Sequence, residues 1–506
     1  MRCAPRNLAE AAGQDEDRSA FPNLSRVTAK AGGVTLLVTS FAFSLHVAPA
    51  WAQQDETTIH SKDGLTLRWH LQAGINAVSE DNLFWNFSDT LAPWADFDPD
   101  ARWLELYVKP GLSFERALDN GGLAYGKLSV VSSYTAGIDA FDGGNSGRTT
   151  LEEGYLGFRL GLSRATDLDV SIGPRELKLG SGMLIADGGA SGFERGALKL
   201  GPRKAWKMAA IGRVETDLRH ATIFYIKPNE VPSQDRKNEL AGLDLRQDWQ
   251  NGGYLGASYI HVLRSQSPYI RAAADGIGAP EIIPGGRDGT NAVNLYARLN
   301  VSEGSLKNWF FTADYAHEWN DRVDLDAWGG RIQAGYIFAD RPWKPSITYS
   351  FQIFSGDDPD TAKLERFDPL YYEGSPGAWA TGSKSSFIFI NSNVYSHEIA
   401  FSVQPTQRDT VTLRYSHIRA NQLNSPIQFG QATRIETEGS TVNLISGVTD
   451  THLSDDLFLE YNKVVNANTY LTAGVSVSFP GQGIKDIVNG KAPSWSGGFI
   501  NVIVNF

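Results

Sequence analysis

The chain has 506 residues, a formal net charge of −11 at pH 7, 51 glycines, 13 tryptophans and one cysteine, Cys3. The acidic balance and the lack of a basic tract argue against a nucleic acid as partner. A single cysteine excludes a disulfide framework and a cysteine-based metal site. The abundance of glycine and aromatic residues favours an all-β chain that is rich in turns.

The N-terminal segment has the pattern of a secretory signal peptide. A basic stretch precedes an apolar run at 33–45, and an Ala-x-Ala site ends at Ala52. We expect cleavage after Ala52, which divides the chain into a leader at 1–52 and a mature protein at 53–506. The alternative for the apolar run is an amphipathic core helix. The run is too short for a membrane-spanning helix, and no later stretch reaches about 18 apolar residues, so no transmembrane helix is expected.

Several later segments alternate apolar and polar residues with a period of two. In 103–116, Leu106, Val108 and Leu112 alternate with polar residues that include Lys109. Bilayer-spanning strands need about 9–11 residues and turn an apolar side chain toward lipid at every second position. The same alternation recurs at 152–162, 291–301, 411–418 and 470–479.

A soluble β-sandwich would also alternate, but three features favour a membrane barrel. The strands are longer than the usual 5–6 residues or so of sandwich strands. Trp and Tyr lie near strand ends, as in the aromatic girdles of outer-membrane barrels. The chain ends on Phe506, after Ile500, Val502 and Val504 at a period of two. We therefore predict a closed antiparallel transmembrane β-barrel of about 16–18 strands in the outer membrane of a Gram-negative bacterium.

Proline and glycine clusters predict the loops. The predicted loops 265–290 and 355–386 exceed ordinary connection lengths, so each is either a constriction or gating segment, or an external loop without a role in gating. The predicted loops are 88–100, 139–148, 181–207, 265–290 and 355–386.

Basic residues on the polar face of the strands are the candidate site. An arginine near the midplane of the lipid face would cost about 2–4 kcal/mol, so these side chains should face the lumen or the rims. A ring of guanidinium groups in a channel attracts carboxylates and can bind them through paired hydrogen bonds. The predicted substrate path comprises Lys109, Arg159, Arg175, Arg246, Arg298, Arg331 and Arg414.

The alternative is that these cations pair with acidic residues across the lumen. The alternation also places acidic side chains on the inner face: Glu105, Glu153, Asp244, Asp314, Glu398 and Glu460. For any single arginine, the sequence leaves both interpretations open.

The sequence contains no recognisable catalytic motif. The pairs His317-Glu318 and His397-Glu398 do not extend to a HExxH zinc motif, and no GxSxG elbow is present. We therefore expect no catalytic residue, no metal site and no cofactor. Because a Ser-His pair can be assembled in space, an outer-membrane lipid hydrolase stays open as an alternative.

Two neighbouring segments resemble the alginate-export family of outer-membrane proteins. Residues 153–159 read Glu-Gly-Tyr-Leu-Gly-Phe-Arg, and 172–185 contain Gly-Pro-Arg-Glu-Leu followed by Gly-Met-Leu-Ile. Segments 354–358 and 470–481 are similar to the family as well. The chain departs from the family at Pro174 and in the basic segment 186–207, and both departures bear on the identity of the substrate.

The resemblance implies a monomeric barrel of about 18 strands with an electropositive lumen that passes an anionic exopolysaccharide outward. It also implies loops that occlude the idle pore. Only Arg159 and Arg175 lie in matching motifs, whereas the other five cations rest on the alternation. The leading hypothesis is a non-enzymatic channel for an alginate-like polymer, with outer-membrane lipid and periplasmic export proteins as further partners. The alternative is an uptake porin for small acids or sugars.

Overall fold

The strands follow the alternating segments of the sequence, as a computed structural model of the chain shows. The structure describes residues 57–91, 93, 97–119, 121–141, 143–163, 165–374, 377–382, 389–427 and 447–506. All of them belong to one unit of the chain. The predicted leader and its cleavage after Ala52 lie outside the described residues.

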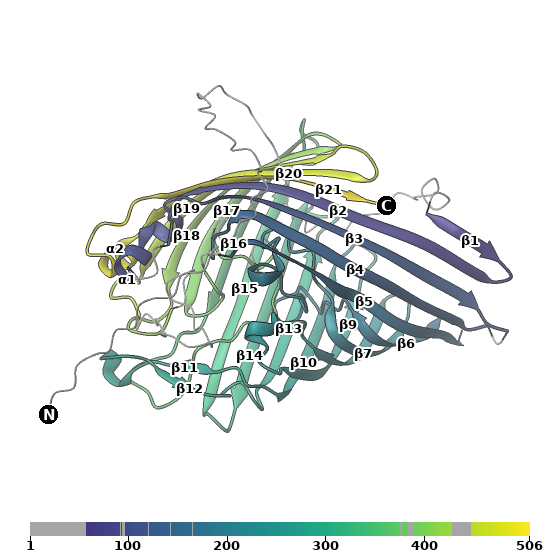
Figure 1. Cartoon of the computed structure of the whole chain (residues 1–506), viewed down its shortest axis with the longest axis horizontal. Coiled ribbons are helices and arrows are strands. Elements are labelled where there is room, and N and C mark those ends of the chain that lie inside the picture. Colours follow the sequence, from purple (N-terminus) through teal and green to yellow (C-terminus); the bar gives the residue numbers. More distant parts are fainter. Residues whose placement is uncertain are drawn as a thin grey trace, which may run out of the picture. The chain divides into compact units, whose positions relative to one another are not determined.

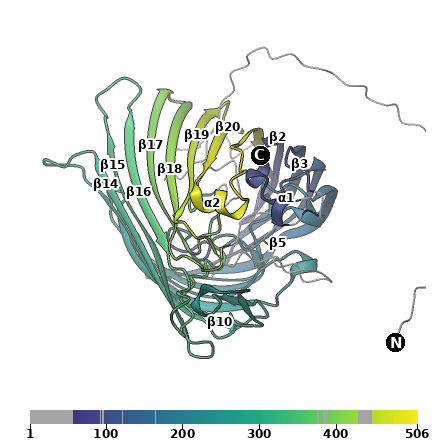
Figure 2. The same cartoon turned by 90° about the vertical axis from the view of Figure 1, so that its left-hand side faces the viewer.

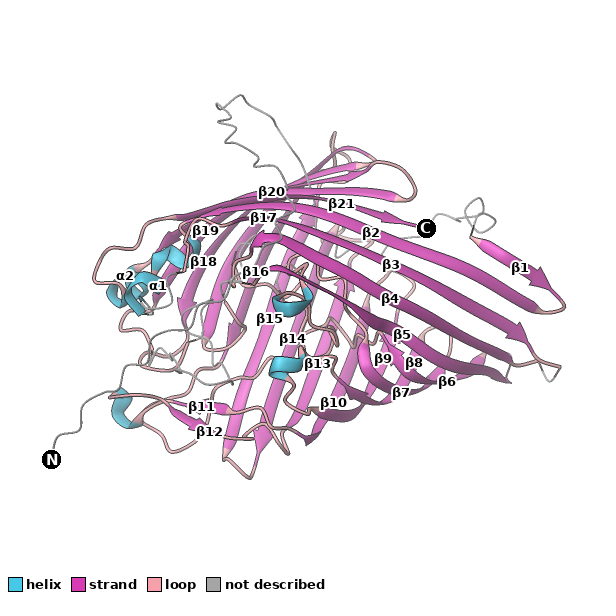
Figure 3. Ribbon diagram, viewed as in Figure 1, coloured by secondary structure: helices cyan, strands magenta, loops and turns pink. Residues whose placement is uncertain are grey.

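A single antiparallel sheet closes on itself to form the barrel (Figures 1 and 3). The sheet has nineteen strands, of which β1 (Thr58–Lys62) pairs with β2 beyond the end of β21, so eighteen strands form the ring. Closure occurs where β2 pairs with both β3 and β21, and Ile75 lies opposite Val502. The prediction of a closed antiparallel barrel of about 16–18 strands is confirmed.

The ring strands follow one another in chain order, each paired with the next. They are β2 (Leu65–Asp81), β3 (Arg102–Ala117), β4 (Leu123–Ile138), β5 (Gly144–Ser163), β6 (Thr166–Arg175), β7 (Trp206–Glu215), β8 (Arg219–Lys227), β9 (Glu239–Asp248), β10 (Tyr254–Arg264), β13 (Asn291–Asn300), β14 (Trp309–Asn320), β15 (Leu325–Ile337), β16 (Ser346–Phe354), β17 (Val394–Thr406), β18 (Asp409–Ala420), β19 (His452–Val464), β20 (Thr469–Pro480) and β21 (Trp495–Asn505).

The remaining elements are short and lie in the connections. Within the described residues, none of the helices is long and apolar enough to cross a membrane. The short elements are η1 (Leu83–Asn86), α1 (Ser88–Leu91), η3 (Phe193–Arg195), η4 (Pro232–Gln234), the hairpin of β11 (Tyr269–Arg271) and β12 (Glu281–Ile283), η5 (Ala274–Gly276) and α2 (Gln482–Ile487).

Burial alternates along the strands as the sequence predicts. In β19, Asp456 and Glu460 are 1% and 2% exposed, whereas Leu457 and Leu459 between them are 40% and 44% exposed. A barrel in a bilayer turns its apolar side chains out toward lipid and its polar side chains in toward the lumen. The exposed aliphatic face is therefore the outer surface of the barrel, and the buried polar face is its inner wall.

The two ends of the barrel differ in the length of their connections. Outer-membrane barrels have short periplasmic turns and longer extracellular loops, so the end with long loops is the extracellular one. The short turns are 118–122, 164–165, 216–218, 249–253, 301–308, 338–345, 407–408 and 465–468. The connections at the other end are 82–101, 139–143, 176–205, 228–238, 265–290, 321–324, 355–393, 421–451 and 481–494.

The predicted loop at 139–148 is wrong in its second half, because β5 begins at Gly144. The glycine- and serine-rich stretch suggests a turn, but Ser146 pairs with Thr135 of β4. A Cβ atom at Gly147 would overlap the carbonyl oxygen of Ser133, so the absence of a side chain permits the close approach. Pairing with a neighbouring strand thus overrides the local preference for a turn.

Candidate functional site

The inner wall carries the seven predicted cations, and four of them form ion pairs with acidic residues. Arg159 binds Asp169, its cross-strand neighbour, through Nε at 3.0 Å and Nη2 at 2.8 Å. Arg414 of β18 binds the buried carboxylate of Glu460 on β19. Both partners come from an adjacent strand, so the register of the sheet decides these pairs.

Two more of the predicted cations have acidic partners close to them in the chain or in a loop. Arg246 donates through Nη2 to Asp248 at 2.7 Å, on the same face of β9, and its guanidinium lies over the ring of Tyr254. Lys109 Nζ lies 3.9 Å from Glu176, the first residue of the connection 176–205. These four cations therefore do pair with acids, but only Glu460 belongs to the acids expected from the sequence, and the partners lie on the same or an adjacent strand or in a loop rather than across the lumen.

Arg175 and Arg298 have a different environment. Neither makes an ion pair with an acidic residue among the residues that the structure describes. The Arg175 guanidinium lies 4.4 Å from the ring centroid of Tyr155, and that of Arg298 lies 4.8 Å from the ring centroid of Phe310. Arg298 Nε also donates to the neutral side chain of Asn300 at 3.0 Å. These positive charges are therefore held by rings and neutral acceptors.

Arg331 is the third cation of this kind and contacts a loop. Its Nη1 donates to the carbonyl oxygen of Ala378 at 2.6 Å, and its guanidinium lies 3.8 Å from the ring centroid of Trp379. Nε is buried and has no hydrogen-bond partner in the described part of the chain. A wall arginine is thus covered by the connection 355–393.

The connection 176–205 folds into the barrel and binds the wall formed by β2 to β5. Lys199 Nζ donates to Glu80 of β2 at 2.5 Å, and the two side chains are 5% and 1% exposed. The second oxygen of Glu80 accepts a hydrogen bond from Trp495 Nε1 at 2.9 Å. The amides of Lys199 and Leu200 donate to the Glu105 carboxylate at 2.9 and 2.8 Å. Two acids of the inner wall are therefore occupied by this loop.

Arg203 continues the same attachment without a carboxylate in direct contact. It donates to Ser133 Oγ and Thr150 Oγ1, each at 2.8 Å, and to the carbonyl oxygen of Arg148 at 2.7 Å. Burial lowers the pKa of Arg203 to about 10. The guanidinium remains charged at neutral pH, and its hydrogen bonds hold the loop against the wall.

The connection 355–393 folds inward from the opposite wall. Asp368 accepts two hydrogen bonds from Arg287 of the connection 265–290, at 2.6 and 2.8 Å. The amide of Asp368 donates to Glu318 on β14 at 2.8 Å. Thr381 accepts a hydrogen bond from Gln352 of β16. With Arg331 on β15, these contacts attach the loop to three neighbouring wall strands.

The two inward loops meet each other within the barrel. Ile185 and Tyr371 form a parallel bridge, and the amide of Glu373 donates to the carbonyl oxygen of Gly182 at 2.9 Å. Trp379 Nε1 donates to the carbonyl oxygen of Ser181 at 3.1 Å. Because the strands that anchor the two loops lie half-way round the ring from each other, the joined loops cross the lumen (Figure 2).

Sequence reasoning did not predict the part that 176–205 plays in this crossing or its contact with 355–393. It marked 265–290 and 355–386 as constriction candidates, and it noted the basic segment 186–207 without predicting where its charges go. The alternation does place Glu80 and Glu318 on the inner face, which was an available signal for the wall acids. No local pattern pairs Lys199 with Glu80, because 119 positions separate them.

Comparison with known families identifies one match. A family model described as alginate export matches residues 145–491, which is more than half of the chain. The matched region begins in β5 and ends in the connection before β21, so it contains both loops that cross the lumen. The chain matches none of the curated proteins.

Solved outer-membrane structures are similar to the chain only distantly. OmpT of Vibrio cholerae has 10% identity and a TM-score of 0.37, over 88% of this chain and 99% of that one. Salmonella typhi OmpF, in a complex with daunomycin, has 11% identity and a TM-score of 0.42, over 89% and 100%. Acinetobacter baumannii OccAB2 has 10% identity and a TM-score of 0.49, over 87% and 98%. At these values the three structures have no bearing on the function of this chain.

Proposed function

Because the chain belongs to the alginate export family, we propose that it passes an acidic polysaccharide through its lumen by contacts with Arg175, Arg298 and Arg331. The protein lies in the outer membrane of a Gram-negative bacterium, and its family is one of export proteins rather than of hydrolases. The observation that carries the proposal is the set of three inner-wall guanidinium groups that contact aromatic rings and neutral acceptors and form no direct ion pair among the described residues.

The chemistry of an acidic polymer suits these three side chains. A carboxylate that enters the pore loses hydration, and a guanidinium can offset that loss through two parallel hydrogen bonds. The cations already paired, such as Arg159 with Asp169, would have to give up a carboxylate before they could bind another. Several weak sites in series let a polymer move from one to the next without being trapped. The export step requires no covalent chemistry.

The loops that cross the lumen represent the closed state in this proposal. Arg331 is held by the carbonyl oxygen of Ala378 and by the face of Trp379, both in the connection 355–393. A uronate carboxylate is a stronger acceptor for a guanidinium than a neutral carbonyl group. The arriving polymer therefore competes with the loop for Arg331, so that binding favours release of the loop from the wall.

Single-channel conductance with added oligouronates tests the proposal. The double variant Arg175→Gln/Arg298→Gln leaves the inward loops attached and removes two cations without acidic partners. We expect oligomannuronate to block this variant at concentrations roughly tenfold or more above those that block the wild type, since hydrogen bonds to charged groups contribute about 1.5–3 kcal/mol each.

The matched control is Arg159→Gln/Arg246→Gln, which changes the net charge equally but removes cations that already have acidic partners. Its block by oligomannuronate should stay close to that of the wild type. An equal loss in both variants would mean that only the average charge of the lumen matters, and the assignment to individual arginines would be wrong.

The monomeric state, the periplasmic partners and the signal peptide stay predictions from the sequence.

A further inference from the structure

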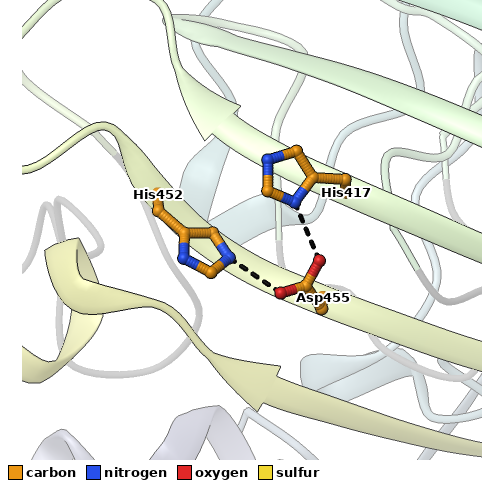
Figure 4. A group of neighbouring side chains, drawn as sticks. All are labelled: His417, His452 and Asp455. Carbon is orange, nitrogen blue, oxygen red and sulfur yellow. Dashed lines mark hydrogen bonds and ion pairs between the residues drawn. The ribbon is translucent and has the colours of Figure 1, made fainter.

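Two imidazoles and a carboxylate meet where β18 and β19 lie side by side (Figure 4). They lie on the outer face of the barrel, since His417 and Asp455 are in phase with the exposed side chains of Tyr415 and Leu457. His417 Nδ1 lies 2.8 Å from one oxygen of Asp455, and His452 Nε2 lies 2.9 Å from the other. The three ligand atoms all lie within 4.8 Å of one another. The side chains are partly exposed, at 29–33% for the three, so solvent can reach the cluster.

The sheet places two of these residues and a β-bulge places the third. His417 on β18 and Asp455 on β19 are directly opposite in the register. His452 and Asp455 are three positions apart, a spacing that puts side chains on opposite faces of a regular strand. The register shifts between Ile418 and Arg419, and Leu453 and Ser454 are both fully buried. This extra residue returns His452 to the outer face, as bulges commonly do for a functional side chain.

The charges around the cluster leave its carboxylate without a permanent cation. Among the described residues, no lysine or arginine forms an ion pair with Asp455. The nearest arginine along β18, Arg419, instead binds Thr451 and lies over the ring of Tyr395. The Tyr415 hydroxyl donates to Asp455 at 2.7 Å and so fixes the orientation of the carboxylate. A partner behind a ligand group is a regular feature of metal sites.

We propose that His417, His452 and Asp455 bind a divalent transition-metal ion of the zinc type on the outer surface of the barrel. Two neutral imidazoles and one carboxylate match the ligand preference of Zn²⁺, and they leave a fourth tetrahedral position for water. Mg²⁺ and Ca²⁺ prefer oxygen ligands, and a set with two imidazoles disfavours them. The ligand atoms, which lie within 4.8 Å of one another, would move closer together to surround an ion at the usual bond lengths of about 2.0–2.2 Å.

The location gives the bound ion a structural consequence. β18 ends and β19 begins at the connection 421–451, and the ligands come from both strands. An ion held by His417 on one side and by His452 on the other joins the two ends of this extracellular connection. Because the ion binds the folded arrangement and not the unfolded chain, its binding stabilises the register of β18 against β19. The site is separate from the inner wall, so it does not depend on the proposed export function.

Equilibrium binding of Zn²⁺ to the full barrel tests the proposal. The protein is purified in detergent without a histidine tag, treated with EDTA and then freed of the chelator. We expect one Zn²⁺ per barrel by titration calorimetry, and a visible tetrahedral absorption band when Co²⁺ replaces it. His452→Ala and Asp455→Asn should each weaken binding by at least about tenfold. Loss of a group that only supports a ligand already weakens metal binding by about that factor, so loss of a ligand should do no less.

The control is His317→Ala, which removes another outward histidine that also contacts an acid, Asp326, at 2.9 Å. Its Zn²⁺ affinity and Co²⁺ spectrum should match those of the wild type. Heat-dependent gel migration shows whether each variant has folded. The proposal is overturned if the folded wild type binds no Zn²⁺ in the micromolar range, or if it binds no more tightly than His452→Ala.

Discussion

The two loops that cross the lumen are both held by buried charged groups, but they differ in whether the loop supplies the cation or the groups that accept hydrogen bonds from a cation. The connection 176–205 supplies its own cations, Lys199 and Arg203, to the acids and backbone oxygens of the wall. The connection 355–393 instead supplies an acid, Asp368, to Arg287, and offers the Ala378 carbonyl oxygen to Arg331 of the wall. One loop therefore neutralises the wall, whereas the other covers a wall cation.

This difference shows why basic residues in a sequence are a poor guide to the charge that a substrate meets. The segment 186–207 looks like an anion-binding surface, yet Lys199 and Arg203 are buried in contacts within the protein. Arg331 is an isolated arginine in a strand, and its partners are a neutral carbonyl group and an indole ring. Movement of Arg331 onto a substrate carboxylate breaks no direct ion pair, whereas movement of Lys199 breaks its buried ion pair with Glu80.

The largest effect is expected from breaking the attachment of the first loop. Glu80→Ala leaves Lys199 buried without its counter-charge, and removing one partner of a buried pair costs about 3–5 kcal/mol. We expect the segment 176–205 to become sensitive to protease in the folded barrel, and the single-channel conductance to rise. The double variant Glu80→Gln/Lys199→Met removes both charges and should recover most of the attachment. Equal protection of Glu80→Ala and wild type would show that this pair does not hold the loop.

An intermediate effect is expected at the second loop. Arg331→Gln removes a desolvated cation–π contact with Trp379, which contributes about 2 kcal/mol. Channel openings should become more frequent, while protection of the segment 176–205 should change less than in Glu80→Ala. Arg331→Lys keeps the charge, so its frequency of channel opening should fall between those of the wild type and Arg331→Gln. A conductance identical to that of the wild type in Arg331→Gln would contradict the role of Arg331 in holding the loop.

The smallest effect is expected where the two loops touch each other through an exposed pair. Lys178 binds Glu373 at 2.7 Å, but the side chains are 45% and 27% exposed. Pairs of this exposure contribute about 0–1 kcal/mol and are weakened by salt. Lys178→Gln should change the open probability by less than about fivefold, and high salt should remove that difference. A larger change, independent of salt, would mean that this contact and not the wall holds the loops together.

The sequence predicted the barrel well because its signals are local. A period of two over 103–116 or 411–418 is enough to define a strand and its two faces, since lipid accepts only the apolar one. The inward direction of Lys109 and Arg414 follows from the same rule. The loop at 139–148 was wrong in part, because pairing with β4 decides the start of β5.

The candidate site was predicted only as a set of cations on one face. The fold decides which of these cations have an acidic partner, because it brings together distant residues such as Glu460 and Arg414, which are 46 positions apart in the chain. The cluster of His417, His452 and Asp455 likewise depends on a register and a bulge that no local pattern reveals. By itself, the sequence determined the strands, their two faces and the class of membrane, because burial in lipid acts on each strand separately. Only the tertiary structure decided the pairing of charges, because an ion pair is a property of two distant positions and of the loops folded between them.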